Sequence, residues 1–149
     1  MLELMRPLAL VPLAAALALS GCTASSDADT FEATGSVSVP SGADVRYVGQ
    51  LCDDFRGVSD RPVRGDFDDV TEGAQVVVEN ESGTTIAVGR LGVGTLVESS
   101  GDSLACEYPF SLSNLPIAEF YAVQVGTAER GDLRFTHSEM QSGVTISLD

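Results

Sequence analysis

The chain has 149 residues, with 22 acidic against 8 basic side chains and a formal net charge of −14 at pH 7. All its cations are arginines, so Schiff-base lysines, P-loop lysines and Lys–Asn isopeptide bonds are excluded. The acidic excess also argues against nucleic-acid binding, because phosphates are neutralised by Lys and Arg, and against electrostatic attachment to anionic lipid, which needs basic clusters.

The chain opens with a short leader. Residues 8–19 form an apolar run that follows a single cation, Arg6, and contains Pro12. A membrane-spanning helix needs roughly 20 apolar residues, whereas the apolar region of a signal peptide needs only about 7–15. The run therefore predicts an export signal rather than a permanent membrane span.

The motif Leu19-Ser20-Gly21-Cys22 resembles the lipobox of bacterial lipoproteins. The resemblance implies that residues 1–21 are a lipoprotein signal peptide and that the Cys22 thiol receives a diacylglyceryl group. Two acyl chains of the palmitate kind anchor a protein stably where one is marginal. The expected partner is the membrane, through lipid on Cys22, at the extracytoplasmic face of the cell membrane. The alternative is an ordinary secretory cut near Ala18 or Gly21 that leaves an incidental thiol.

Removal of residues 1–21 leaves 128 residues, the length of one domain. Residues 22–30 are small, polar and without pattern, which predicts a lipidated flexible tether ahead of a domain at residues 31–149. Cys52 and Cys106 remain once Cys22 is acylated, and two cysteines outside the cytoplasm predict one disulfide. The alternative is two free buried thiols. Zinc is disfavoured, because two Cys and one distant His do not supply a closed tetrahedral set.

From residue 31 the apolar residues recur with the period of a strand. Residues 31–39 alternate apolar and polar, which predicts a strand with one buried face, and a less regular strand is expected at 45–51. Residues 53–73 are rich in Asp, Arg and Gly and are expected to be a loop. Residues 74–80 and 84–91 predict a hairpin with Gly83 at the positive-φ position of its turn. The sequence GRLGVG at 89–94 predicts a flexible turn, since its spacing is not that of a phosphate-binding loop.

Apolar and polar residues alternate most regularly at 104–112, which predicts another strand. Cys106 lies on its apolar side, so the disulfide is expected inside the core. Pro109 lies on the polar side and lacks an N–H, which implies an edge or a bulge. Further strands are predicted at 121–125, 133–135 and 144–148, and a single helical turn at most at 138–141. If Tyr121 faces inward, Phe120 must face outward or lie at an edge.

Seven or eight short strands with no helical stripe after Cys22 predict an all-β fold. We expect a single antiparallel β-sandwich of about seven strands, immunoglobulin-like or transthyretin-like. The segments GAQVVVENESGTTIAVGRL, CEYPFSLSNLP and FYAVQVG, in that order, resemble small secreted or lipid-anchored proteins of actinobacteria with no assigned activity. More loosely they are similar to transthyretin-like and carboxypeptidase regulatory-like sandwiches. The resemblance spans residues 73–148 and implies a fold but no activity.

Four carboxylates lie within seven residues of the acidic loop: Asp66, Asp68, Asp69 and Glu72. Oxygen ligands at this density suit calcium, although the spacing is not that of an EF-hand. The alternative is a solvated acidic loop with arginines interleaved as counter-charges. No other metal or cofactor is expected.

A hydrolase with a Ser-His-Asp site would have to use His137 as its base, because this is the only histidine in the chain. Ser138, Ser142 and Asp132 are close to it in sequence, but no G-x-S-x-G elbow is present, so no catalytic residue is predicted. We therefore expect a non-catalytic binding or interaction module, not an enzyme, with an unknown envelope protein or small ligand as partner. The alternatives are a carrier of a small apolar ligand between the sheets, a hydrolase using His137, and an acidic loop that binds a cationic partner.

Overall fold

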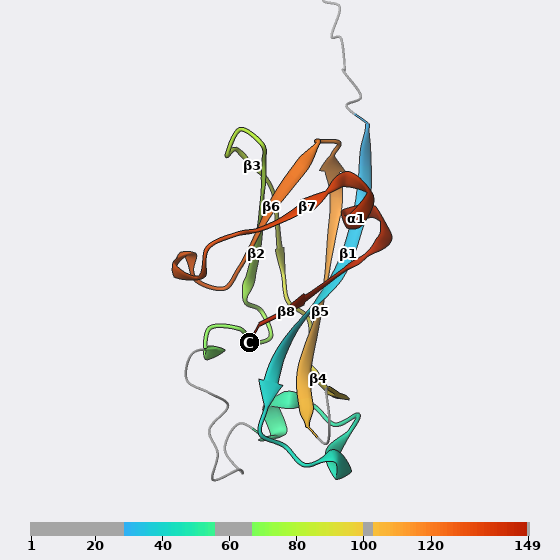
Figure 1. Cartoon of the computed structure of the whole chain (residues 1–149), viewed down its shortest axis with the longest axis vertical. Helices are drawn as coiled ribbons and strands as arrows, with labels where there is room; N and C mark the ends of the chain where they lie inside the picture. The colour runs from blue at the N-terminus through green and yellow to red at the C-terminus, as the bar shows by residue number, and fades with distance from the viewer. Residues whose placement is uncertain (1–28, 56–66, 100–102, 149) are drawn as a thin grey trace, which may run out of the picture.

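The chain is described by a computed structural model at residues 29–55, 67–99 and 103–148 (Figure 1). In chain order the elements, with η for a 3₁₀ helix, are β1 (Thr30–Ser41), η1 (Val45–Tyr47), η2 (Cys52–Phe55), β2 (Gln75–Asn80), β3 (Thr85–Arg90), β4 (Thr95–Glu98), β5 (Leu104–Pro116), β6 (Phe120–Val125), η4 (Ala128–Arg130), β7 (Leu133–Thr136), α1 (His137–Ser142) and β8 (Val144–Ser147). Cys22 lies outside the described residues, so its acylation stays a prediction.

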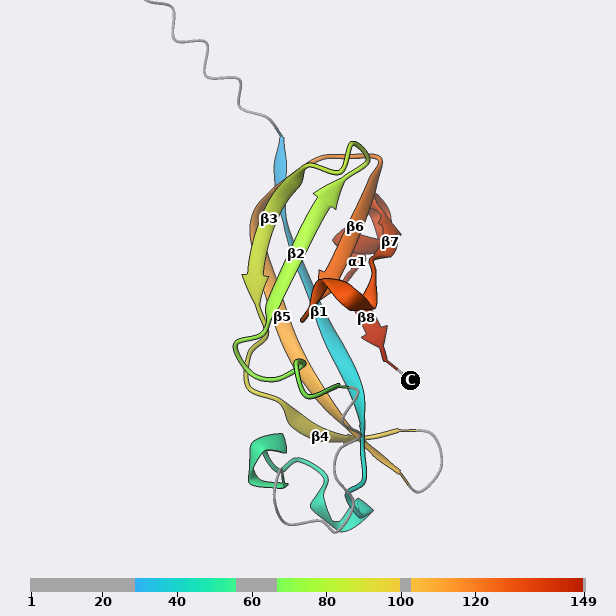
Figure 2. The same ribbon diagram turned by 90° about the vertical axis from the view of Figure 1, so that its left-hand side faces the viewer.

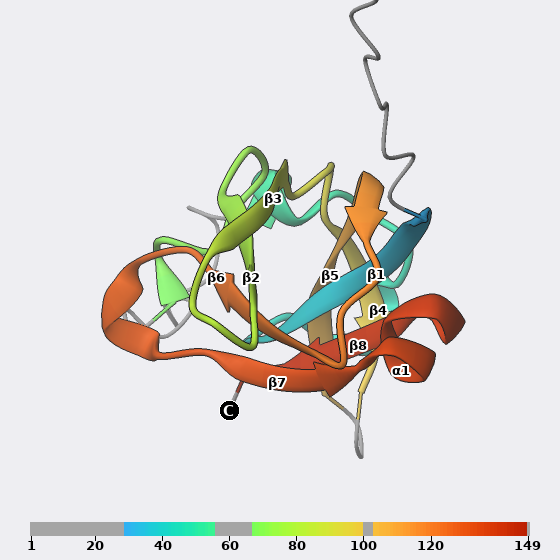
Figure 3. The same ribbon diagram turned by 90° about the horizontal axis from the view of Figure 1, so that it is seen from above.

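Two four-stranded sheets form the fold, and this confirms the predicted all-β sandwich (Figures 1 and 2). One sheet has the order β4-β5-β1-β8 and the other the order β3-β2-β6-β7. Neighbouring strands run antiparallel except β1 and β8, which pair in parallel between Gly35 and Ser38 of β1. Seen along the long axis, the end strands β7 and β8 of the two sheets lie on the same side of the molecule (Figure 3).

The core is filled by the inward positions of each strand. On β6, Tyr121 and Val123 are buried whereas Phe120 is 44% exposed, which confirms the predicted opposite orientation of Phe120 and Tyr121. Gly35 takes an inward position of β1, where a Cβ would come within 2.5 Å of the Phe110 ring. The absent side chain therefore lets Phe110 fill the core at that point.

Two glycines let the chain pass closely from β3 in one sheet to β4 in the other. A Cβ at Gly89 would approach the Leu112 side chain to 2.6 Å, and a Cβ at Gly94 would overlap the ring of Tyr108. Leu112 and Tyr108 are buried side chains of β5, so the crossing segment lies directly against that strand. The prediction of a flexible turn at 89–94 is therefore wrong, because these glycines serve close packing.

Pro109 lies within the inner strand β5 but at a local edge. β4 pairs with β5 only between Leu104 and Glu107, and past that point the Pro109 carbonyl accepts a hydrogen bond from the Gly92 N–H at 2.7 Å. The N and C=O of one residue in an antiparallel strand point to the same side. The missing N–H of Pro109 therefore faces the side that β4 has left, as the predicted edge requires.

Cys52 and Cys106 form the predicted disulfide, and both residues are buried in the core. Their Cα atoms are 5.8 Å apart, within the range that a disulfide spans. Cys106 is on β5 and Cys52 begins η2, so the bond holds the segment after β1 against the sheet. The Cys52 N–H also donates to the Gly94 carbonyl at 3.0 Å.

The strand expected at 45–51 is replaced by η1, because the Asp44 side chain accepts a hydrogen bond from the Arg46 N–H and caps a 3₁₀ turn. Only Leu51 makes a β-bridge, to Thr95. Within the described ranges, no helix has the length and apolar character that crossing a bilayer requires.

Candidate functional site

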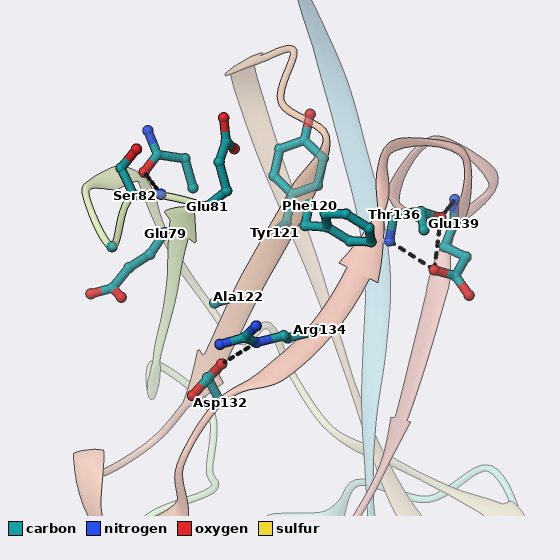
Figure 4. A pocket seen from close by; sticks show the side chains of 12 residues that line it. Glu79, Glu81, Ser82, Phe120, Tyr121, Ala122, Asp132, Arg134, Thr136 and Glu139 are labelled. Carbon is teal, nitrogen blue, oxygen red and sulfur yellow. Dashed lines mark hydrogen bonds and ion pairs between the residues drawn. The ribbon is translucent and has the colours of Figure 1, made fainter.

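A hollow of about 550 Å³ lies on the outward face of the β3-β2-β6-β7 sheet (Figure 4). It is bordered by β2, β6, β7, the β2–β3 turn and the first turn of α1, and we call it the outer hollow. The lining residues that matter most below are Glu79, Glu81, Phe120, Ala122, Arg134 and Glu139.

The hollow exists because its floor is an alanine between longer side chains. Ala122 on β6 pairs with Glu79 on β2 and with Arg134 on β7, so the three residues form one row across the sheet. Phe120, two residues earlier on the same face of β6, stands next to that row. The small side chain of Ala122 and the longer side chains around it together produce the concavity.

The rim on the β2 side is a fixed turn. The Asn80 side-chain oxygen accepts hydrogen bonds from the N–H groups of Ser82 and Thr84, each at 3.0 Å. Gly83 has φ +74°, as the sequence predicted for this turn. These bonds set where Glu81 stands at the rim of the hollow.

The opposite rim is the start of α1, which is longer than the single turn predicted. A capping box begins the helix: the Thr136 hydroxyl accepts from the Glu139 N–H, and the Glu139 carboxylate accepts from the Thr136 N–H at 2.8 Å. Hydrogen bonds from the Thr136 backbone and hydroxyl lower the pKa of Glu139. Glu139 is therefore held as a carboxylate, and one of its oxygens, Oε2, accepts both of these bonds.

The lining carries four carboxylates, Glu79, Glu81, Asp132 and Glu139, against one guanidinium. That guanidinium, of Arg134, is 80% exposed and lies 3.6 Å from the Asp132 carboxylate, a geometry that stabilises little. Glu79 is half-buried, and in the described part of the chain neither its carboxylate nor that of Glu81 takes part in a hydrogen bond or ion pair. The hollow thus presents uncompensated negative charge beside an aromatic ring.

Tyr121 fixes the β5–β6 connection behind the hollow. Its hydroxyl donates to the Pro116 carbonyl at 3.0 Å and accepts from the Ala118 N–H at 2.8 Å. Burial raises the pKa of Tyr121, so the phenol stays neutral. His137 Nδ1 lies 3.3 Å from the same hydroxyl, and the His137 ring meets the edge of Phe31 at a centroid distance of 4.7 Å.

The serines near His137 make other contacts. The Ser138 hydroxyl lies 3.3 Å from the Thr136 hydroxyl, and the Ser142 hydroxyl donates to the Ser138 carbonyl at 2.7 Å. Among the described residues, then, no serine is hydrogen-bonded to His137. A serine nucleophile needs such a base, so this geometry lends the hydrolase alternative no support.

Of the predicted calcium ligands, Asp66 lies outside the described residues, and Asp68 and Glu72 are exposed. Where the chain is described, no three His, Cys, Asp or Glu side chains gather closely enough to hold a metal ion. The calcium site stays a prediction.

Asp69, the remaining predicted ligand, is engaged by the loop after β6. Its carboxylate accepts a hydrogen bond from the Thr127 N–H at 2.8 Å and forms an ion pair with Arg130. The Arg130 guanidinium also lies over the Phe67 ring, 4.8 Å from its centroid. The Arg130 hydrogen bond is the main cause that lowers the pKa of Asp69 to about 2. We call this group the Asp69–Arg130 clamp.

A second concavity opens between the end strands β7 and β8. It has a volume of about 320 Å³ and we call it the edge slot. Its lining includes Phe67, Val123, Val125, Leu133, Ile146 and Leu148. The core between the sheets is occupied by large buried side chains such as Tyr108 and Met140, whereas this slot offers room for a small apolar ligand.

The sequence identified Phe120 as outward-facing but not the hollow beside it. The sequence does indicate that Glu79, Ala122 and Arg134 each occupy an outward position of a predicted strand. These three residues are neighbours only because β2 pairs with β6 and β6 pairs with β7. The alternation of apolar and polar residues within a strand does not specify which strands pair.

Comparisons with known proteins found no family model, no curated protein and no solved structure that matches this chain.

Proposed function

We propose that this protein is a lipid-anchored, non-catalytic binding module of the cell envelope that engages its partner through the outer hollow. The motif Leu19-Ser20-Gly21-Cys22 supports the anchor. The buried disulfide supports a site outside the cytoplasm, since disulfides persist in oxidising compartments.

The outer hollow is the observation that carries the binding role. Its volume of about 550 Å³ falls within the roughly 300–1,000 Å³ of typical ligand sites. Its floor is on paired strands, and its two rims are fixed by the Asn80 turn and the Thr136–Glu139 capping box. A site fixed in advance loses less conformational freedom on binding, which favours affinity.

Filling the hollow tests the proposal. The full-length chain, solubilised in detergent, serves as bait for an envelope extract, as wild type and as Ala122→Trp. The matched control is Thr145→Trp, which adds the same side chain at an exposed position of β8 on the other sheet. We expect the same partner with wild type and control and its loss with Ala122→Trp. Equal capture by Ala122→Trp would contradict a role for the hollow.

The anchor is tested separately by intact-mass spectrometry of the membrane fraction. We expect a chain that begins at Cys22 and carries acyl groups on it. A free thiol at that position, or a chain that still begins at Met1, would contradict the anchor but leave the hollow to be judged by the capture experiment.

The edge slot favours a second candidate function, carriage of a small apolar molecule. Its volume of about 320 Å³ is near the lower end of ligand sites. Native mass spectrometry of the protein purified from membranes tests this function. A bound apolar molecule that Val125→Phe displaces supports it, and spectra with no bound mass in the wild type contradict it.

A further inference from the structure

We propose that the outer hollow receives an arginine side chain from a partner protein, which lies over Ala122 between the Phe120 ring on one side and the Glu79 and Glu81 carboxylates on the other. The inference rests on the proposed function, which it deepens by naming the chemistry of the partner.

Charge is the first step of the argument. The four carboxylates and single guanidinium of the lining give the hollow a net negative charge. Glu139 caps the helix through one oxygen and Asp132 faces Arg134, whereas in the described chain Glu79 and Glu81 make neither a hydrogen bond nor an ion pair. Glu79 is half-buried, and a carboxylate removed from water gains more from an incoming cation than an exposed one does.

The exposed ring is the second step. Phe120 is 44% exposed although it belongs to a paired strand, and Figure 4 shows its ring on the α1 side of the hollow, near Thr136, with Glu79 and Glu81 on the opposite side. A cation above an aromatic face is attracted by the ring quadrupole. The planar guanidinium of arginine stacks on a ring and also donates to carboxylates in a fork, which the compact ammonium of lysine cannot do.

The shape of the hollow is the third step, because it selects among cations. Its volume of about 550 Å³ is far too large for a bare metal ion, and the described residues hold no three-carboxylate cluster that would coordinate one. Nucleic acid is repelled by the charge of −14. An extended peptide segment that places one arginine over Ala122 matches both the charge of the hollow and its exposed ring.

The test uses the full-length protein in detergent and a labelled peptide of alternating glycine and arginine. The control peptide has citrulline in place of arginine, which keeps the shape and removes the charge. Fluorescence anisotropy at low salt measures both affinities. We expect binding of the arginine peptide alone, with a loss of affinity as the salt concentration rises.

Variants separate the hollow from the overall charge of the protein. Glu79→Gln with Glu81→Gln should weaken binding about tenfold, the sum of two partly exposed ion pairs, and Phe120→Ala about threefold. The matched control is Glu98→Gln with Glu129→Gln, which removes the same charge from exposed positions outside the hollow and should change affinity less than about twofold. Because Glu79, Glu81 and Phe120 do not belong to the buried core, these variants should fold, and a thermal melt checks this.

Binding of the citrulline peptide as tightly as the arginine peptide would overturn the inference. So would an equal loss in the Glu98→Gln/Glu129→Gln control, because the effect would then be one of total charge. If Ala122→Trp abolishes capture of the envelope partner while the arginine peptide fails to bind, the inference is wrong and the binding role of the hollow stands. If Ala122→Trp changes neither measurement, both are wrong.

Discussion

Replacing Asp69 with Asn should destabilise the fold at neutral pH through loss of one charge. The asparagine keeps the size of the side chain and an oxygen for the Thr127 N–H, so packing changes little. It removes the negative charge that faces Arg130, which is held near 4.8 Å from the Phe67 ring. The clamp ties the segment before β2 to the loop between β6 and β7, so its loss should be felt by the whole sandwich.

The pKa of Asp69 gives the magnitude. The hydrogen bond from Arg130 is the largest cause that lowers it from 3.8 to about 2, with smaller contributions from the Thr127 N–H and the Arg130 charge, and each pKa unit corresponds to about 1.4 kcal/mol. The clamp therefore contributes on the order of 2 kcal/mol to the free energy of unfolding, a reasonable value for a pair whose side chains are only 21% and 22% exposed. Asp69→Asn should lose about this amount at pH 7.

The pH dependence has a definite sign. A carboxyl whose pKa is lower in the folded state contributes stability above its unfolded pKa and loses it as pH falls. The contribution of Asp69 is thus complete above pH 3.8 and declines as pH falls toward about 2. Urea unfolding of wild type and Asp69→Asn should differ at pH 7 and converge near pH 2.

The matched control is Asp44→Asn, which removes the same kind of charge from the Arg46–Asp44 ion pair. Those side chains are 69% and 50% exposed, and exposed pairs stabilise little, so no measurable loss is expected. This role of the clamp would be refuted if Asp69→Asn lost as little free energy of unfolding at pH 7 as Asp44→Asn does. It would also be refuted if the difference between wild type and Asp69→Asn were the same at pH 2 as at pH 7.

Three further changes should lower stability. Replacing Cys52 and Cys106 by alanine opens a 54-residue separation and should cost about 4 kcal/mol by the chain-entropy model; an unchanged urea midpoint would contradict this. Gly94→Ala forces a methyl into the Tyr108 ring and should cost about 1–3 kcal/mol; a thermal melt equal to wild type would show that the crossing has room. Tyr121→Phe strands two backbone partners of the hydroxyl and should cost about 1–3 kcal/mol, unless calorimetry finds the two proteins equally stable.

Most strands were predictable because each depends on its own residues. The hairpin of β2 and β3 follows from alternation and from a turn that ends in Gly83, and β5 follows from the row around Cys106. The parallel pairing of β8 with β1 was not predictable, since it depends on how α1 carries the chain back across the edge of the sandwich. The error at 89–94 has the same origin. From the sequence alone, a glycine that is needed for close packing against Tyr108 cannot be distinguished from a glycine in a flexible turn.

The site was predictable only in part. Phe120 faces outward because its neighbour Tyr121 faces inward, and that follows from the geometry of any strand. The row of Glu79, Ala122 and Arg134 needs the register of three strands, which the chain alone does not state. Similarly, the main partner of Asp69 is an arginine 61 residues away, whereas the sequence drew attention only to the acidic neighbours of Asp69.

The placement of β1 has a mechanical consequence. The strand enters the sandwich at Thr30 and pairs with β5 along nearly its whole length, to Ser41. Its ladder bonds lie perpendicular to the strand, so a force applied through the N-terminus loads them in shear, many at once, instead of unzipping them singly. A domain pulled from its N-terminal end should therefore yield last at β1.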